Sequence, residues 1–330
     1  MKAKISIITG FLVGAVLLYL AFRNLDFKTL LEIYSHVNPL FLVPFALTAL
    51  VELLMRALRW RLLLLPSGPV RLWDAFRLQA AGLALSNILP MRLGEIARGT
   101  FGAKLFGIPM LTVFATILVE RALDVLVLFL LFAAAAYTGN ITGGFMHYNK
   151  LLWVLFGGLI AGLLALVFSD EIISHHWFSG FFARFPRLRS VFERVAMGVR
   201  GFHSFKSGLL IFLFAAAQWL LDALNYYWMA IAFGLEGTLN FARCVALVFS
   251  GAVAASVPGM PGYFGNFEFT LSRVMAAWGV PKDVGFAFAS YCHVAGYILI
   301  TLIGVVFVYQ MGQSLGKVWS DFSGGGKEPA

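Results

Sequence analysis

Charged residues are scarce in this sequence. Only 12% of its 330 residues are Asp, Glu, Lys or Arg, whereas 60% are hydrophobic. A soluble domain carries about 25% charged residues, which keep its surface in contact with water. A chain with so little charge cannot cover a water-facing surface, so lipid is expected to be its main solvent.

The sequence also lacks the patterns of several protein classes. Its two cysteines, Cys244 and Cys292, fall in apolar segments without CxxC or zinc-binding spacing, so neither a disulfide framework nor a metal site is expected. The absence of GxxxxGK[ST] excludes an ATP-driven pump that uses this motif. No nucleophile–base arrangement is visible, so we expect no enzymatic activity and no cofactor.

Basic residues give a net charge of +9, and they are grouped between apolar runs. Cytoplasmic loops show this pattern, whereas a nucleic-acid-binding surface would also need exposed aromatic residues. The groups are Lys2 and Lys4, then Arg56, Arg59, Arg61, Arg71 and Arg77, then the segment 169–207, and finally Lys317 and Lys327. We therefore predict a protein of the cytoplasmic membrane with both termini cytoplasmic and no nucleic-acid partner.

Six apolar runs are long enough to cross a bilayer as helices, which takes about 20 residues. They are residues 5–22, 40–65, 110–136, 151–168, 208–233 and 284–310. The first run has no small-residue cleavage site at its end, so it is interpreted as a span and not as a signal peptide.

Two further apolar stretches, residues 74–106 and 241–278, are interrupted by proline and glycine, through which a helix cannot run straight. The pieces are short for a full crossing, so re-entrant hairpins are predicted. The residues expected to break the helices are Pro90, Gly94, Pro258, Gly259, Pro261, Gly262 and Gly265. The predicted fold class is an all-α integral membrane protein with about six full spans plus two broken hairpins, or eight to ten crossings if the hairpins open.

Residues 1–319 are predicted to form one transmembrane domain with an internal repeat. The sequence FGIPMLTVFA at 106–115 resembles WGVPKDVGFA at 278–287, with a constant offset of 172 (278 − 106). Each half, about 40–136 and 208–310, then contains a span, a broken hairpin and a second span. The predicted orientation runs matching spans in opposite directions, and inverted repeats with broken helices are typical of transporters.

Two segments lie outside these halves. The linker 169–207 is basic and amphipathic over 175–205, so it is interpreted either as a helix on the inner membrane surface or as an ordinary loop. The tail 320–330 is rich in glycine and is expected to be disordered. Glycines at 157–162 favour close helix packing within one chain or between copies, which leaves a homo-oligomer open.

Ionisable groups inside the membrane cost at least about 2.5–3.5 kcal/mol at a helix centre, which points to function or pairing. Arg92, Glu95 and Arg98 follow the first break, where the start of a half-helix favours an anion such as phosphate. Alternatively, they mark the cytoplasmic end of the hairpin.

A second cluster, Glu120, Arg121 and Asp124, lies inside the predicted span 110–136. It either contacts the substrate or forms structural ion pairs that one further arginine would complete.

A third group follows the second break. Asn266 and Glu268 lie directly after it, and His293 occupies the repeat position of Arg121, since 293 − 121 = 172. Glu268 is expected to pair with an arginine of the other half or to accept a proton. His293 also fits a satisfied core histidine.

Two other polar pairs occupy matching spans. Glu52 and Arg56 lie in the first, and Asp222 and Asn225 lie in the second. They either line one cavity or lie at the ends of their spans.

Three motifs carry a family resemblance: residues 87–98 (NILPMRLGEIAR), 120–124 (ERALD) and 258–268 (PGMPGYFGNFE). Together they resemble the flippase-like transmembrane domain of lysylphosphatidylglycerol synthases, over roughly residues 5–310. The resemblance implies movement of lipids between leaflets. Because the chain continues only to residue 330, synthesis of aminoacyl lipids is not expected, and the lipid stays open between an anionic phospholipid, a polyprenyl-phosphate lipid and a glycolipid.

The leading hypothesis is a lipid transporter in which Arg92, Arg98 and Arg121 engage an anionic phosphate headgroup. Four acids would balance these charges, one of them taking up a proton: Glu95, Glu120, Asp124 and Glu268. A second hypothesis is a non-transporting partner that holds a lipid-synthesising enzyme or a glycosyltransferase through segment 175–205. A third, an intramembrane enzyme using Glu120 and Asp124, lacks a recognisable nucleophile.

Overall fold

The structure is a computed structural model, and it describes residues 26–89, 93–138, 204–257 and 260–312 together with a few isolated positions. Every regular element in these ranges is a helix. Outside the ranges lie most or all of the predicted spans 5–22 and 151–168, the linker 169–207 and the tail 320–330.

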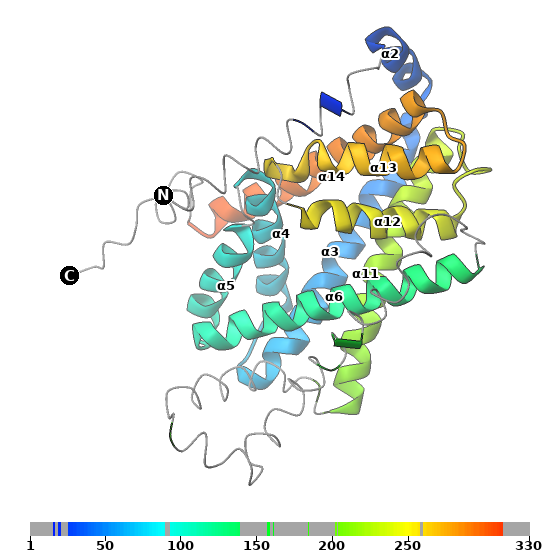
Figure 1. Cartoon of the computed structure of the whole chain (residues 1–330). Helices are drawn as coiled ribbons and strands as arrows, with labels where there is room; N and C mark the ends of the chain where they lie inside the picture. The colour runs from blue at the N-terminus through cyan, green and yellow to red at the C-terminus, as the bar shows by residue number, and fades with distance from the viewer. Residues whose placement is uncertain are drawn as a thin grey trace.

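The described helices follow one another along the chain in two series, one before residue 139 and one after residue 203 (Figure 1). In chain order they are α2 (Phe27–His36), α3 (Leu42–Leu64), α4 (Leu72–Ile88), α5 (Leu93–Phe106), α6 (Met110–Thr138), α11 (Phe205–Ala232), α12 (Phe241–Ser256), α13 (Asn266–Ala277) and α14 (Lys282–Gln310). Short 3-10 turns are η1 (Pro39–Phe41), η2 (Leu65–Ser67) and η6 (Pro261–Tyr263).

The long helices α3, α6, α11 and α14 match four of the predicted spans to within a few residues. Within the described ranges, the helical stretches long and apolar enough to cross a membrane are Pro39–Ser67, Phe205–Ala232 and Lys282–Gln310. Helix α6 has the same length as α14, 29 residues, but carries three charged residues near its centre. The predicted all-α membrane class is confirmed.

Large apolar side chains are exposed on the outward faces of the long helices. On α14, Val294, Ile298, Leu302 and Val306 recur every four residues and are 42–64% exposed. This spacing places them on one face of the helix. An exposed apolar stripe of this length is unfavourable in water, so this face is suited to lipid.

The two broken stretches form pairs of short helices, α4 with α5 and α12 with α13. Their lengths of 12 to 17 residues correspond to about 18–26 Å, less than the hydrocarbon core of about 30 Å. Between α12 and α13, Pro261 opens η6, and Gly262 and Gly265 adopt φ angles of 72° and 90°. Residues with a Cβ rarely adopt these angles, so the glycines allow the break.

The break between α4 and α5 is described only in part. Gly94 lies in the first turn of α5, where a Cβ would overlap the backbone of Gly82 and Ser86 on α4. Gly94 therefore allows these two helices to pack closely. Pro90, Arg92, Pro258 and Gly259 lie outside the described residues.

The two halves pack in corresponding ways. Helices α3, α4, α5 and α6 of the first half match α11, α12, α13 and α14 of the second. Under this exchange, the contact α4–α14 becomes α12–α6, α5–α6 becomes α13–α14, and α3–α4 becomes α11–α12, and all six pairs are in contact. Because α4 and α12 each pack on the last helix of the opposite half, the halves are interleaved.

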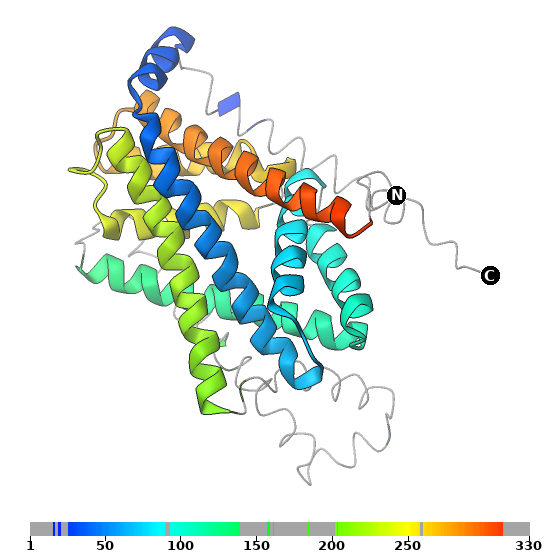
Figure 2. The same cartoon turned by 180° about the vertical axis from the view of Figure 1, so that it is seen from behind.

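Helices α3 and α11 form the central seam and run antiparallel, side by side (Figure 2). The start of α3 lies by the end of α11, where the Asn38 backbone N–H donates to the Ala232 carbonyl over 3.1 Å. Nearly two turns into α3, Trp228 Nε1 donates to Thr48 Oγ1 over 3.1 Å. Further along, the Arg56 guanidinium lies 5.6 Å from the Trp219 ring centroid.

The α4–α14 contact depends on Gly304 of α14. A Cβ at this position would overlap the carbonyl group of Ala80 and the side chain of Ala84 on α4. Small residues on both helices therefore let the two backbones approach, as in other membrane helix pairs.

Gly304→Ala is expected to lower the thermal unfolding midpoint of the detergent-purified protein by several degrees. The added methyl group overpacks a backbone contact, which typically costs about 1–3 kcal/mol. The matched control is Gly285→Ala on the same helix, where the nearest atom to a Cβ would be 3.5 Å away, an ordinary contact. Equal midpoints for the two variants would contradict this packing.

Candidate functional site

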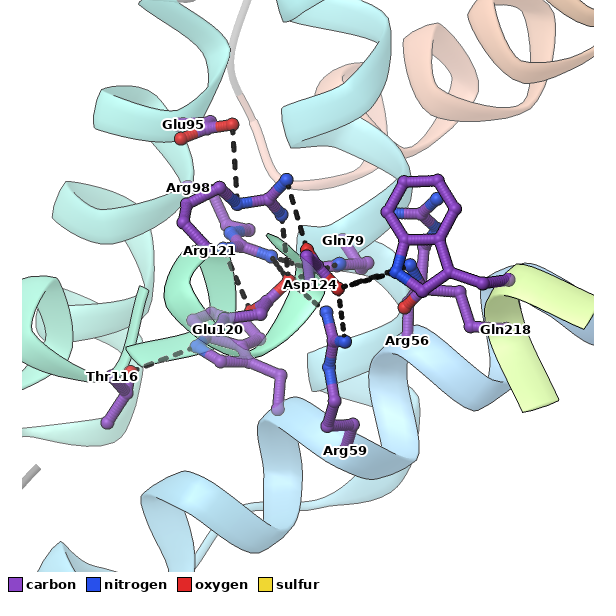
Figure 3. Close-up of polar contacts among 12 residues, drawn as sticks. Arg56, Arg59, Gln79, Glu95, Arg98, Thr116, Glu120, Arg121, Asp124 and Gln218 are labelled. Atoms are coloured by element: carbon purple, nitrogen blue, oxygen red, sulfur yellow. Dashed lines mark hydrogen bonds and ion pairs between the residues drawn. The ribbon is translucent and has the colours of Figure 1, made fainter. Parts of the chain in front are cut away.

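A buried ion network joins α3, α5 and α6, and its members are Arg59, Arg98, Glu120, Arg121, Asp124 and Glu95 (Figure 3). Arg59 lies at its centre, and its side chain is fully buried. Its Nη2 lies 3.0 Å from Glu120 Oε1, and its Nη1 donates to Asp124 Oδ1 over 2.5 Å. One cation of α3 thus binds both acids of α6.

Arg98 brings α5 and α4 into the network. Its Nη2 lies 3.2 Å from Glu120 Oε2, and its Nη1 donates to Gln79 Oε1 of α4. The guanidinium also lies over Trp60, 4.7 Å from the ring centroid. These contacts pair the charge of Arg98 and cover its apolar face, so the side chain is held inside the protein.

Arg121 lies at the outer edge of the network. Its side chain is 32% exposed and contacts Glu120 at 3.0 Å, Asp124 at 3.3 Å and Glu95 at 3.7 Å. Glu95 is 30% exposed, so this pair faces outward while Arg59 and Glu120 lie behind it.

The network is neutral, with three arginines and three carboxylates. Isolated charges inside a membrane protein are costly, and mutual pairing removes most of that cost. As structural ion pairs, Glu120, Arg121 and Asp124 would need one further arginine, and the structure supplies two, Arg59 and Arg98. The charges of the inner members are therefore balanced without a ligand.

Arg59 is not among the site residues predicted from sequence, where it is interpreted as one of the basic loop residues. The structure corrects this interpretation: Arg56 and Arg59 both lie within α3, so they are not evidence for orientation. The available signal was their position, since both fall inside the apolar run 40–65.

A second polar group lies at the start of α13. Glu268 Oε1 is 2.6 Å from His293 Nδ1, and Glu268 Oε2 accepts from the Gly265 backbone N–H over 2.7 Å. Asn266 Nδ2 donates to the Val257 carbonyl over 3.0 Å. These contacts cap the helix ends at the break.

Glu268 therefore pairs with a histidine of its own half. Among the residues that the structure describes, no arginine contacts it. The His293 ring lies between Phe264 and Phe267, with centroids 4.5 and 4.6 Å away.

The two polar groups occupy similar positions in the two halves of the described structure. Glu95 is the third residue of α5, and Glu268 is the third residue of α13. Each meets a basic side chain on the following long helix, Arg121 in the first half and His293 in the second. By sequence, Glu95 and Glu268 correspond only approximately. In the structure they make similar contacts, each with a basic side chain of the following long helix.

The two groups are not in direct contact within the described structure, and a cavity of about 290 Å³ lies between the halves. Helices α3, α4, α11 and α14 and the turn η6 contribute most of its lining. Its polar lining residues include Glu52, Arg56, Asn87, Asp222, Asn225 and His293, and its aromatic ones include Phe45, Tyr226, Tyr263, Phe267 and Tyr297. Of the two interpretations of Glu52, Arg56, Asp222 and Asn225, the single cavity is confirmed.

The cavity is linked to the ion network through Arg56. Arg56 Nη2 binds Glu52 at 2.7 Å, and its guanidinium packs on the Trp219 ring. Trp219 Nε1 in turn donates to Asp124 Oδ1 over 3.2 Å. Arg56 and Trp219 therefore connect the cavity to Asp124, so a change of charge in the cavity would affect the network through these side chains.

Within the described ranges, no group of His, Cys, Asp and Glu side chains has the arrangement of a metal site. The cavity itself offers charged and hydrogen-bonding side chains beside an aromatic wall.

Comparison with known proteins identifies relatives of similar length. Residues 7–304 match the family model described as "Lysylphosphatidylglycerol synthase TM region". A UPF0104 membrane protein of Methanothermobacter thermautotrophicus is 25% identical over 77% of this chain and 78% of its own length. A UPF0104 membrane protein of Methanocaldococcus jannaschii is 23% identical over 96% of this chain and 97% of its own. No solved structure matches.

Arg59→Met is expected to destabilise the fold by about 3–5 kcal/mol, because it leaves two buried carboxylates short of a cation. Thermal unfolding and size-exclusion chromatography in detergent measure this loss. Arg121→Met should cost clearly less, since its side chain is one-third exposed. Adding Glu120→Gln to Arg59→Met restores a neutral network and should recover part of the stability; no recovery would contradict the charge-balance explanation.

Proposed function

Because the chain belongs to the lysylphosphatidylglycerol synthase transmembrane-region family, we propose that it moves an anionic, phosphate-bearing lipid between the leaflets of the membrane. The observation that carries this proposal is the charged, aromatic-lined cavity between two corresponding halves, next to a broken hairpin. Transporters built from repeats bind their substrates at such an interface, where broken helices meet.

The size of the cavity favours a headgroup. Sites for whole drug-sized ligands usually measure about 300–1,000 Å³. At about 290 Å³ the cavity suits a polar headgroup, while the acyl or prenyl chains stay in the bilayer against the apolar outer faces.

The antiparallel seam supports an inverted relation of the halves. Helices α3 and α11 hold matching positions in the contact pattern and run in opposite directions. In this proposal the two halves are inserted with opposite orientation in the cytoplasmic membrane, and both termini are cytoplasmic.

Arg121 is the arginine of the network best placed to meet a phosphate, because its side chain is partly exposed beside Glu95. Arg56 offers a second cation in the cavity wall. Arg92 precedes α5, and Arg98 lies behind, holding Glu120 and Gln79 in place. In this proposal, a phosphate competes with Glu95 for Arg121 and is drawn toward the cavity.

Arg121→Ala is expected to reduce lipid translocation at least tenfold in proteoliposomes, with the protein still folded. Movement between leaflets is measured by adding a reductant outside, which reacts with the label of lipids in the outer leaflet. The labelled lipids are phosphatidylglycerol, phosphatidylethanolamine, aminoacyl-phosphatidylglycerol and polyprenyl phosphate. The matched control is Arg273→Ala on α13, an exposed arginine that packs on Phe269 outside the site.

Wild-type rates in folded Arg121→Ala would overturn the assigned role. No movement of any lipid by folded wild-type protein would overturn transport itself. That result would favour the alternative, a membrane partner of a lipid-modifying enzyme or a glycosyltransferase, and co-purification would then identify the enzyme.

A further inference from the structure

Asp222 differs from the other acids of the cavity and the ion network. Glu120 and Asp124 contact arginines, Glu52 contacts Arg56, and Glu268 contacts His293. Asp222 lines the cavity from the middle of α11, and no ion pair or hydrogen bond reaches its side chain from the residues that the structure describes. It is the acid at this site that lacks a compensating group.

The surroundings of Asp222 leave the cavity with excess negative charge. Across the seam, Glu52 and Arg56 of α3 form a 2.7 Å pair that is neutral by itself. From α14, His293 is paired with Glu268, and the thiol of Cys292 is neutral. The other titratable groups facing this space are phenols: Tyr226 on α11, Tyr263 on η6 and Tyr297 on α14.

Asn225 gives a second, independent observation. It lies three residues from Asp222, on the same face of α11, and is 5% exposed. Its Oδ1 is buried without a hydrogen-bond partner in the described structure, and the residue lines the cavity. Buried polar groups are normally paired. The Asn225 Oδ1 and the Asp222 carboxylate both accept hydrogen bonds, so this part of the cavity lacks a hydrogen-bond donor.

We propose that Asp222 takes up one proton when the anionic headgroup enters beside Arg56, so that proton and lipid cross together. This inference rests on the proposed function and identifies proton movement as the energy source of transport. A proton from the water on one side forms an O–H bond on the Asp222 carboxylate, and when the lipid leaves this bond breaks and the proton passes to the water on the other side. The neutral carboxyl group no longer repels the phosphate, and its hydroxyl group becomes a donor within the cavity.

The charge of Arg56 favours a proton over a metal ion. A sodium ion would need several oxygen ligands and would lie close to a guanidinium in the same 290 Å³ space. A proton needs one carboxylate oxygen and takes no volume. The acids expected from sequence to couple transport are less suited, because Glu120 and Asp124 are held by arginines.

Infrared difference spectroscopy tests the proton site without any lipid movement. Purified protein is titrated between about pH 5.5 and 9, where exposed carboxylates remain ionised. We expect the carbonyl stretch of a protonated carboxyl group to grow as the pH falls, to vanish in Asp222→Asn and to persist in Asp283→Asn. The control residue lies in the first turn of α14, outside the cavity lining. A wild-type spectrum without such a band, or one unchanged in Asp222→Asn, overturns the proposal.

Proteoliposomes with labelled phosphatidylglycerol test the coupling. A pH gradient should speed wild-type and Asp283→Asn translocation several-fold in the direction of proton flow, and it should not change the rate of Asp222→Asn. Gradient-driven movement in Asp222→Asn, or driving by a sodium gradient instead, overturns the proposal. If the wild type moves no lipid, the proposed function fails, while the infrared titration still decides whether Asp222 binds a proton.

Discussion

The bond from Arg59 to two acids of α6 is the interaction on which the arrangement of the first half depends. A fully buried guanidinium such as that of Arg59 is stable in a membrane protein only if neighbouring carboxylates neutralise its charge. Glu120 and Asp124 provide that match, and Glu120 in turn fixes Arg98 and so the position of α5. Three helices, α3, α5 and α6, are thus held in register by a set of charges that none of them could bury alone.

Much of the fold was predictable, because the membrane imposes simple rules on sequence. Apolar length gave four helices to within a few residues, and glycine and proline gave the position of the second break. The candidate site was less predictable. Spacing along a helix showed that Glu120 and Asp124 share a face, but it could not show that Arg59, 61 residues before Glu120 (120 − 59), would lie between them.

The candidate site residues also divided in a way that no local pattern could indicate. Arg121 on α6 and His293 on α14 occupy matching positions in the two halves. They nevertheless belong to two separate polar groups, and a cavity lies between the halves. This separation depends on which helices pack together, and helix packing involves residues that are far apart in the sequence. The remaining polar pairs, Glu52 with Arg56 and Asp222 with Asn225, could be placed on matching spans, but only packing across the α3–α11 seam brings them to one space.

The interleaving of the halves has a consequence for biogenesis. Helix α4 packs against α14, which is synthesised some 200 residues later, and α6 packs against α12. Contacts so distant along the chain form late, and a chain that emerges N-terminus first must wait for them. The face of α4 that contacts Gly304 therefore exists before the helix that covers it, and the first half has to stay open to α14 until the last helix has been synthesised.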